Sequence, residues 1–154
     1  MGKLAPLISG RLVAFDTAPL IYYIEENPLY LPLVDELFDT IDSGTSTGIT
    51  SVLTLQEVLV KPLREGMQDI ADQYRNILKS SINITLANID ESVCEKAANL
   101  RAKYAWLRTP DALQIATAIL NNAEIIVTND DKWKRLNEAQ IVVLQDLLTP
   151  DPSM

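Results

Sequence analysis

Two apolar runs of the sequence are followed by aspartate, which places carboxylates where sites form in α/β proteins. The run at 12–15 is followed by Asp16, and the run at 125–127 is followed by Thr128, Asn129 and Asp130. Ligands of open α/β sheets bind outside the carboxyl ends of the strands, so both aspartates are candidate site residues. Either one could instead cap the helix that follows it.

Asp111 and Glu57 are two further acids, each in a helical segment. Asp111 follows Thr109, the expected N-cap, and Pro110, so it lies in a first turn, where the helix dipole alone would favour a carboxylate. Glu57 lies inside the almost wholly apolar segment 53–60, where an unpaired carboxylate would raise its pKa or destabilise the fold. Glu57 could also face solvent on an otherwise buried helix.

The four acids form a set of oxygen ligands without a histidine or thiol partner. The chain has no histidine and one cysteine, which excludes Ser-His-Asp and Cys-His hydrolases and histidine-bound zinc enzymes. Mg²⁺ and Mn²⁺ prefer oxygen ligands, and two such ions about 3.5–4 Å apart can activate a water for phosphodiester cleavage. Thr128 and Asn129 could add a group that binds a water or a phosphate oxygen.

Alternating strands and helices are predicted to position these acids. Apolar or alternating runs predict strands at 12–15, 48–50, 82–89, 125–127 and 141–144. Helices are predicted after Thr17, which is expected to cap the first one, and over 31–41, 53–60 up to an interruption at Pro62, 69–78, 90–104 and 109–121. This order favours an α/β fold with a parallel sheet and helices on both of its faces.

The net charge of the chain comes from one region. The 154 residues contain 21 acids and 13 bases, which gives −8. Residues 12–60 hold eight acids and no Lys or Arg, so the remainder is balanced. An acidic face of this kind argues by itself against nucleic-acid binding, because phosphate attraction normally needs a basic surface.

The expected organisation is one domain with two short ends and no membrane segment. Residues 1–11 are predicted as an N-terminal leader, 12–148 as the domain, and 149–154, which include two prolines, as a C-terminal tail. The apolar stretch 4–8 is too short for a signal peptide, and no apolar run reaches the ~18 residues of a membrane span. With one cysteine and no export signal, the chain is expected in the cytoplasm.

Around the four acids the sequence resembles the PIN-domain family, especially the VapC-like ribonuclease toxins of toxin–antitoxin modules. Four segments between Leu12 and Leu148 carry the resemblance in family order and spacing: 13–21, 49–58, 109–118 and 126–130. The most specific is TPDALQIATA at 109–118. The resemblance implies a three-layer α/β/α sandwich with a mainly parallel central sheet. It also implies an endoribonuclease dependent on Mg²⁺ or Mn²⁺, which leaves a 3′-hydroxyl and a 5′-phosphate.

The resemblance implies roles for five residues: metal binding by Asp16, Glu57, Asp111 and Asp130, and a supporting hydroxyl from Thr128. Asp131 is a neighbour of the family position and is left out of the ligand set. Gln114 stands where many relatives have histidine, and that position is not a metal ligand in the family pattern. The change therefore leaves the expected ligand set intact.

The resemblance also implies partners: an RNA substrate, a cognate antitoxin that covers the acidic groove, and a second copy in a homodimer. Apolar residues at 19–38 exceed one core-facing stripe and would form these protein surfaces, unless they fill a crowded core. Bases flank the acidic motifs and could contact the RNA backbone: Lys61, Arg64, Arg108, Lys132, Lys134 and Arg135. The alternative is a catalytically inert PIN-like binding or scaffold module.

The chain lacks residues that other α/β protein classes require. A HAD-type phosphatase would need an acid two positions after Asp16, where the chain has Ala18. A response-regulator receiver would need an acidic pair after the first strand and a late lysine, and neither is evident. No glycine-rich phosphate loop is present, which argues against P-loop and dinucleotide-binding proteins.

Overall fold

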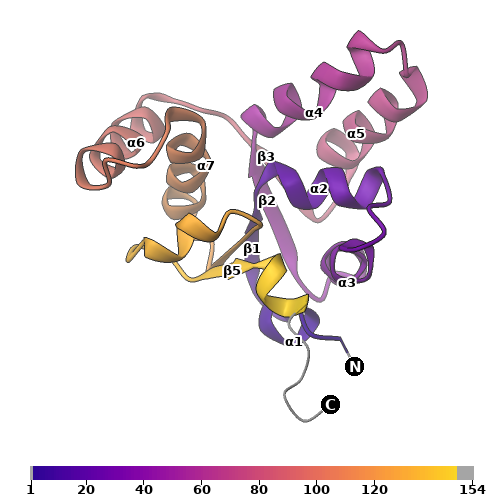
Figure 1. Cartoon of the computed structure of the whole chain (residues 1–154), viewed down its shortest axis with the longest axis horizontal. Helices are drawn as coiled ribbons and strands as arrows, with labels where there is room; N and C mark the ends of the chain where they lie inside the picture. Colours follow the sequence, from indigo (N-terminus) through magenta and orange to yellow (C-terminus); the bar gives the residue numbers. More distant parts are fainter. Residues whose placement is uncertain (1, 149–154) are drawn as a thin grey trace.

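The computed structural model describes residues 2–148 and shows a parallel sheet between two groups of helices (Figure 1). Within those residues, five strands pair in the order β3-β2-β1-β4-β5, all parallel. They are β1 (Leu12–Phe15), β2 (Thr47–Ser51), β3 (Ile84–Ala87), β4 (Ile125–Thr128) and β5 (Ile141–Val143). The expected three-layer α/β/α sandwich is confirmed, whereas the expected tail at 149–154 lies outside the described residues.

Helices cover the two faces of the sheet in unequal groups (Figure 1). One face carries α2 (Thr17–Ile24), α3 (Leu31–Asp42), α4 (Val52–Arg64) and α5 (Gln68–Ser80). The other carries α6 (Glu91–Lys103) and α7 (Thr109–Leu120), with the 3₁₀ helix η1 (Asp131–Arg135) packed beside them. A further 3₁₀ helix, η2 (Leu144–Leu148), follows β5.

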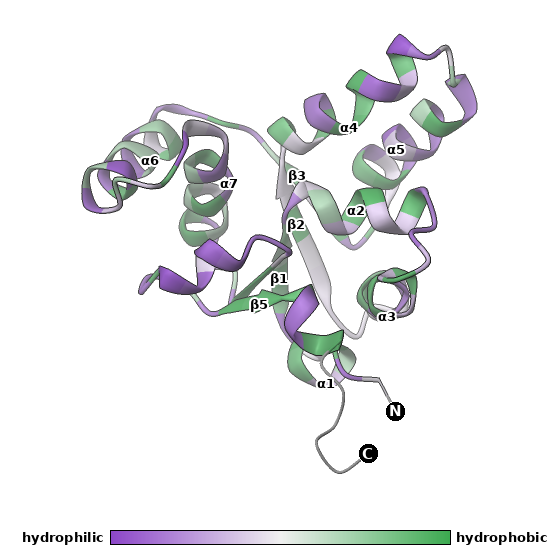
Figure 2. Ribbon diagram, in the orientation of Figure 1, coloured by the Kyte–Doolittle hydropathy of each residue, from purple (hydrophilic) through white to green (hydrophobic). Residues whose placement is uncertain are grey.

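Strand β1 lies between two apolar cores and contributes to each of them. Val13 and Phe15 belong to the core under α2, α3 and α5, whereas Ala14 belongs to the core under α6 and α7. Successive side chains of a strand point to opposite faces, so a continuous apolar run is what a strand buried on both faces requires. Figure 2 shows α7 as mostly hydrophobic, while α5 and α6 alternate between hydrophobic and hydrophilic residues.

The predicted ends of one helix and one strand are wrong. Helix α4 continues through Pro62 to Arg64 instead of stopping there. Proline removes one helical hydrogen bond, but Pro62 is buried and only one turn from the helix end, so tertiary packing keeps the last turn helical. Strand β3 spans Ile84–Ala87 rather than 82–89, because its pairing with β2 runs only from Ile84, opposite Gly48, to Ala87, opposite Ser51. Ile82 lies before that pairing and is 97% exposed.

The predicted leader packs onto the domain in the residues that the structure describes. Helix α1 (Ala5–Ile8) lies in this segment, and Leu4 and Ile8 are fully buried in the core that also holds α3. Glu36 of α3 accepts hydrogen bonds at its Oε1 from the Leu4 and Ala5 backbone amides, at 3.1 and 3.0 Å. One acid of the 12–60 stretch therefore caps a helix.

The apolar surplus at 19–38 mostly fills the core. Leu20, Leu33, Leu37 and Phe38 are buried, and most of the other apolar side chains of this segment are partly buried against them. Leu29 is the exception, with 59% of its surface exposed. Within residues 2–148, no helix is long and apolar enough to cross a membrane.

Candidate active site

The strand order reverses between β1 and β4, whose carboxyl ends lie side by side. The chain proceeds from β1 to β2 and β3 in one direction across the sheet, and β4 and β5 lie on the other side of β1. Such a reversal leaves a crevice outside the strand ends, where α/β proteins bind ligands. Phe15 is paired with Val127, so Asp16 leaves β1 beside the end of β4.

Asp16 is held at both carboxylate oxygens. Its Oδ1 accepts from the Thr17 amide at 2.8 Å, which makes Asp16 the N-cap of α2, and its Oδ2 accepts from the Thr128 hydroxyl at 2.9 Å. The expected cap, Thr17, is instead the first helical residue. Burial is the largest cause that raises the pKa of Asp16 to about 6; the nearby Asp111 and Glu57 carboxylates act in the same direction, and these two hydrogen bonds oppose the shift.

Glu57 lies on α4 with its carboxylate within reach of the end of β1. The Thr17 hydroxyl donates to Glu57 Oε1 at 2.6 Å, so one residue contacts both Asp16 and Glu57. Glu57 is exposed, which agrees with the solvent-facing alternative for this helix. Glu57 is thus an exposed carboxylate near Asp16.

Asp111 approaches Asp16 from the other side of the sheet. It lies in the first turn of α7, whose N-cap is Arg108 rather than the expected Thr109, since Arg108 has extended backbone angles and Thr109 is already helical. Burial raises the pKa of Asp111, and the facing Asp130 carboxylate raises it further, while Arg108 opposes the shift.

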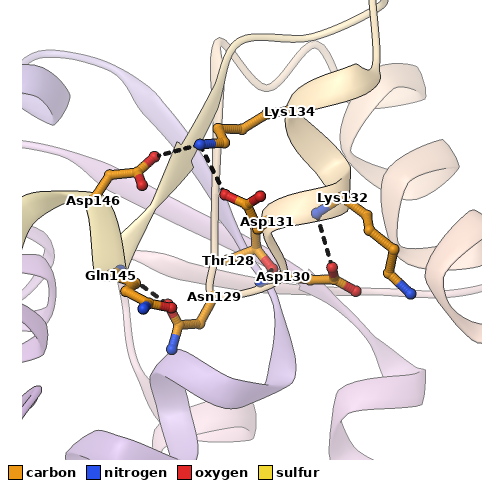
Figure 3. Close-up of polar contacts among 8 residues, drawn as sticks. All are labelled: Thr128, Asn129, Asp130, Asp131, Lys132, Lys134, Gln145 and Asp146. Atoms are coloured by element: carbon orange, nitrogen blue, oxygen red, sulfur yellow. Dashed lines mark hydrogen bonds and ion pairs between the residues drawn. The ribbon is translucent and has the colours of Figure 1, made fainter.

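Asp130 follows β4 and caps η1 by accepting from the Lys132 amide at 3.0 Å (Figure 3). Its own amide donates to the buried Thr128 hydroxyl at 3.1 Å. Thr128 therefore connects Asp16 and Asp130. The sequence offered helix capping and a site at the strand ends as alternative explanations of Asp16 and Asp130. Both hold, because each carboxylate caps a helix, α2 or η1, and also lies at the end of β1 or β4.

The two neighbours of Asp130 are engaged elsewhere (Figure 3). Asn129 donates to the Tyr22 hydroxyl at 3.0 Å and accepts from the Gln145 amide at 2.9 Å, so its side chain holds η2 in place. Asp131 is paired with Lys134 at 2.8 Å, and Lys134 also contacts Asp146. The side chains of Asn129 and Asp131 are therefore bonded to groups other than the four acids.

Several polar groups under the acids were not anticipated from the sequence. Thr17 bridges two acids, and behind it lie the buried side chains of Thr50, Ser51, Thr54 and Gln114. A signal existed in the spacing, because Thr50 and Thr54 are one helical turn apart at the β2–α4 junction, and Gln114 follows Asp111 by three residues on α7. Hydroxyls at these places have common local explanations, so sequence alone could not distinguish them.

The residues fit a divalent cation by their chemistry. The four acids and Thr128 offer carboxylate and hydroxyl oxygens, which suit Mg²⁺ or Mn²⁺. The carboxylates repel one another, and a cation would relieve that repulsion. Among residues 2–148, no three acidic, histidine or cysteine side chains are close enough to form a ready-made metal site. Binding would therefore require side-chain movement of some of these acids.

Known proteins share both the sequence pattern and the fold of this chain. The PIN domain family profile matches residues 13–139. No curated protein matches the sequence. Among solved structures, VapBC2 from Rickettsia felis, described as bound to a DNA fragment from its promoter, is 18% identical with a TM-score of 0.67, over 86% of this chain and 98% of that one.

Two more solved structures show the same fold. A toxin–antitoxin complex from Klebsiella pneumoniae is 21% identical with a TM-score of 0.65, over 86% of this chain and 97% of that one. VapBC-5 from Mycobacterium tuberculosis, described as a member of the VapBC family of toxin–antitoxin systems, is 22% identical with a TM-score of 0.55 over the same shares. The family match spans most of the chain and includes all four acids at the crevice, so the chain belongs to the PIN-domain family.

Proposed function

We propose that this protein is a Mg²⁺- or Mn²⁺-dependent endoribonuclease. The observation that carries the proposal is that four acids from separate elements are linked by their mutual charge effects: Asp16, Glu57, Asp111 and Asp130. Asp16 is affected by the charges of Asp111 and Glu57, and Asp111 by those of Asp130 and Glu57. Four acids in mutual repulsion are costly for a fold, and PIN-domain proteins are generally metal-dependent nucleases, in which such acids serve to hold cations.

The side chains have different roles in the proposed reaction. A bound divalent cation would supply an acidified water as nucleophile and charge stabilisation at the leaving oxygen. Thr17 and Thr128 orient the carboxylates of Glu57 and Asp16 through short hydrogen bonds. Asp111 and Asp130, from α7 and the end of β4, complete the ligand set on the opposite side. Hydrolysis would leave a 3′-hydroxyl and a 5′-phosphate.

Bases at the rim explain how an acidic protein could hold RNA. Arg108 and Lys132 are exposed and act on Asp111 electrostatically, so both lie near the acids. They could contact the phosphates on either side of the cleaved bond. The acidity of the 12–60 region then does not exclude RNA, because part of it would be neutralised by cations.

The proposal is tested by incubating a mixed RNA substrate with the purified protein in Mg²⁺, in Mn²⁺ and in EDTA. Cleavage is expected with either metal, and none in EDTA. Asp16→Asn should abolish cleavage, whereas the matched control Asp131→Asn, next to Asp130 but paired with Lys134, should retain it. Cleavage that persists in EDTA, or that is equal in the two variants, would contradict the proposal.

We also propose that the protein is the toxin of a toxin–antitoxin pair and forms a homodimer. The support is that the similar solved structures are described as VapBC or toxin–antitoxin complexes. Val60, Leu63 and Met67, on α4 and just after it, are 40–48% exposed and offer an apolar surface to a protein partner. A short reading frame beside the gene should encode an antitoxin that suppresses cleavage on mixing, and light scattering should give twice the chain mass.

A further inference from the structure

Gln114 lies at the centre of hydrogen bonds that connect three elements of the site. It is 7% exposed on α7, and its Oε1 accepts from the Ser51 hydroxyl at 3.0 Å. Its Nε2 donates to Thr54 Oγ1 at 2.7 Å and to Thr17 Oγ1 at 3.4 Å. One side chain thus joins the helix of Asp111, the start of α4 and the start of α2.

The start of α4 is fixed directly by these bonds. Ser51 is the N-cap of α4, because its Oγ accepts from the Leu53 amide at 3.2 Å while its proton goes to Gln114. Thr54 lies one turn further along the helix, and Glu57 follows Thr54 by three residues. Gln114 therefore contacts the helix that carries Glu57 at its N-cap, Ser51, and one turn later at Thr54.

The proton positions in the network follow from its geometry. Thr50 donates its only hydroxyl proton to the Phe15 carbonyl at 2.8 Å, so in the 2.8 Å contact between Thr50 and Thr54 the donor is Thr54. Thr54 must then accept from Gln114. The amide of Gln114 is thereby oriented, with its oxygen toward Ser51 and its nitrogen toward the two threonines.

The same reasoning extends to the acid. Thr17 has one hydroxyl proton, and the 2.6 Å bond to Glu57 uses it. The Thr17 oxygen can therefore only accept from the network behind it, where the second amide proton of Gln114 faces it. A continuous set of directed hydrogen bonds runs from Gln114 through Thr17 to the Glu57 carboxylate.

We propose that Gln114 is a positioning residue that fixes Glu57 relative to Asp16 and Asp111 through Thr17 and Thr54, without contacting a ligand itself. Fully satisfied buried networks hold their members in one geometry. Supporting partners of metal ligands typically change affinity or activity by about 10- to 100-fold when removed. This inference rests on the proposed function, because it concerns the placement of a proposed cation ligand.

The test compares Gln114→Met with Thr117→Val. Methionine approximates the shape of glutamine but cannot donate. Thr117 is equally buried on α7, and its hydroxyl donates only to the Leu113 carbonyl of its own helix. For each variant, calorimetry gives the Mn²⁺ dissociation constant and urea titration gives the free energy of unfolding. We expect the dissociation constant to rise about 10-fold or more in Gln114→Met and to stay near the wild-type value in Thr117→Val.

Thr17→Val is a second test in case Gln114→Met folds poorly. It keeps Gln114 and removes the hydroxyl that joins Gln114 to the Glu57 carboxylate. It should weaken Mn²⁺ binding about as much as Gln114→Met, and the double variant should be no weaker than either one alone. Wild-type Mn²⁺ affinity in Gln114→Met or, where that variant does not fold, in Thr17→Val would overturn this inference alone. A wild-type protein that does not bind millimolar Mn²⁺ would overturn the proposed function and this inference with it.

Discussion

The inner pair of acids, Asp16 and Glu57, and the outer pair, Asp111 and Asp130, are held in different ways. Hydroxyl groups from Thr17 and Thr128 fix the inner pair, backed by the buried network around Gln114. Within residues 2–148 no hydrogen bond holds the Asp111 carboxylate, and the Asp130 carboxylate accepts only from the Lys132 backbone amide of η1.

This difference suggests that one pair of carboxylates is rigid and that the other pair can adjust its position. The inner pair occupies one prepared geometry, whereas the outer pair can move to meet a cation and is surrounded by the exposed bases Arg108 and Lys132. Since no three acids lie close enough in the described chain to bind a metal as they stand, the outer pair is the half expected to close on it.

The largest expected effect is the loss of cleavage when either pair loses one carboxylate. Asp16→Asn and Asp111→Asn should each lower the rate of RNA cleavage in Mn²⁺ by more than the about 100-fold expected for a supporting residue. A steady-state assay on a fluorescent RNA measures both. If Asp111→Asn retains most of the activity, the outer pair is not part of the same centre.

Removing a hydroxyl group that holds the inner pair should have the next largest effect, a weaker affinity for Mn²⁺. Thr128→Val leaves all four carboxylates but deletes the proton that Thr128 donates to Asp16. The Mn²⁺ dissociation constant, measured by calorimetry, should rise about 10- to 100-fold. Thr117→Val is the matched control, since it removes an equally buried hydroxyl that contacts no acid. Equal affinities in the two variants would show that Thr128 does not support the cation site.

The pairs should also differ in how they affect stability without metal. The pKa of Asp16 is raised from 3.8 to about 6, so the folded state holds the proton more tightly than the unfolded state. The resulting cost to stability is absent below pH 3.8, grows up to pH 6, and is fully present above it. Asp16→Asn should therefore stabilise the metal-free protein at pH 7.5 by about 1–3 kcal/mol.

Urea unfolding in EDTA at two pH values measures this effect. The gain from Asp16→Asn should be clear at pH 7.5 and smaller near pH 4, where the wild-type carboxyl is already protonated in the folded state. Asp111→Asn should give a smaller gain, because Arg108 and Lys132 offset its repulsion. A destabilised Asp16→Asn at pH 7.5 would mean that its capping bonds outweigh its burial.

The smallest effect is expected at the rim. Lys132→Ala should weaken RNA binding modestly and lower the salt dependence of binding by about 0.7 for each phosphate that the protein no longer neutralises. Fluorescence anisotropy with the inactive Asp16→Asn background at several salt concentrations measures this slope. Lys79→Ala on α5, an exposed lysine of another helix, is the control and should leave the slope unchanged.

The sequence predicted the sheet better than it predicted the support of the site. The buried strands β1 and β4 are short apolar runs bounded by polar residues, and both were located within one residue because this length and pattern fit a strand buried on two faces. The boundary at Pro62 failed because burial outweighed a local rule. The aspartates that follow β1 and β4 could be identified for the same reason as the strands themselves.

The network around Gln114 could not be predicted in the same way. It depends on contacts of Gln114 with Ser51, Thr54 and Thr17, which precede it by 60 to 97 residues. Only the tertiary structure brings these groups together. Threonine at a helix start has ordinary local roles, so its type and position carry no sign of a distant partner. Long-range polar contacts of this kind are decided by packing, not by local pattern.

Calorimetric titration of Mn²⁺ tests most directly whether the inner and outer pairs form one cation site. We expect measurable binding to the wild-type protein, loss of that binding in both Asp16→Asn and Asp111→Asn, and wild-type binding in Asp131→Asn. Absence of binding at millimolar Mn²⁺ would contradict a cation site and favour an inert PIN-like binding module. Binding that survives in Asp16→Asn or Asp111→Asn would contradict a site shared by the two pairs.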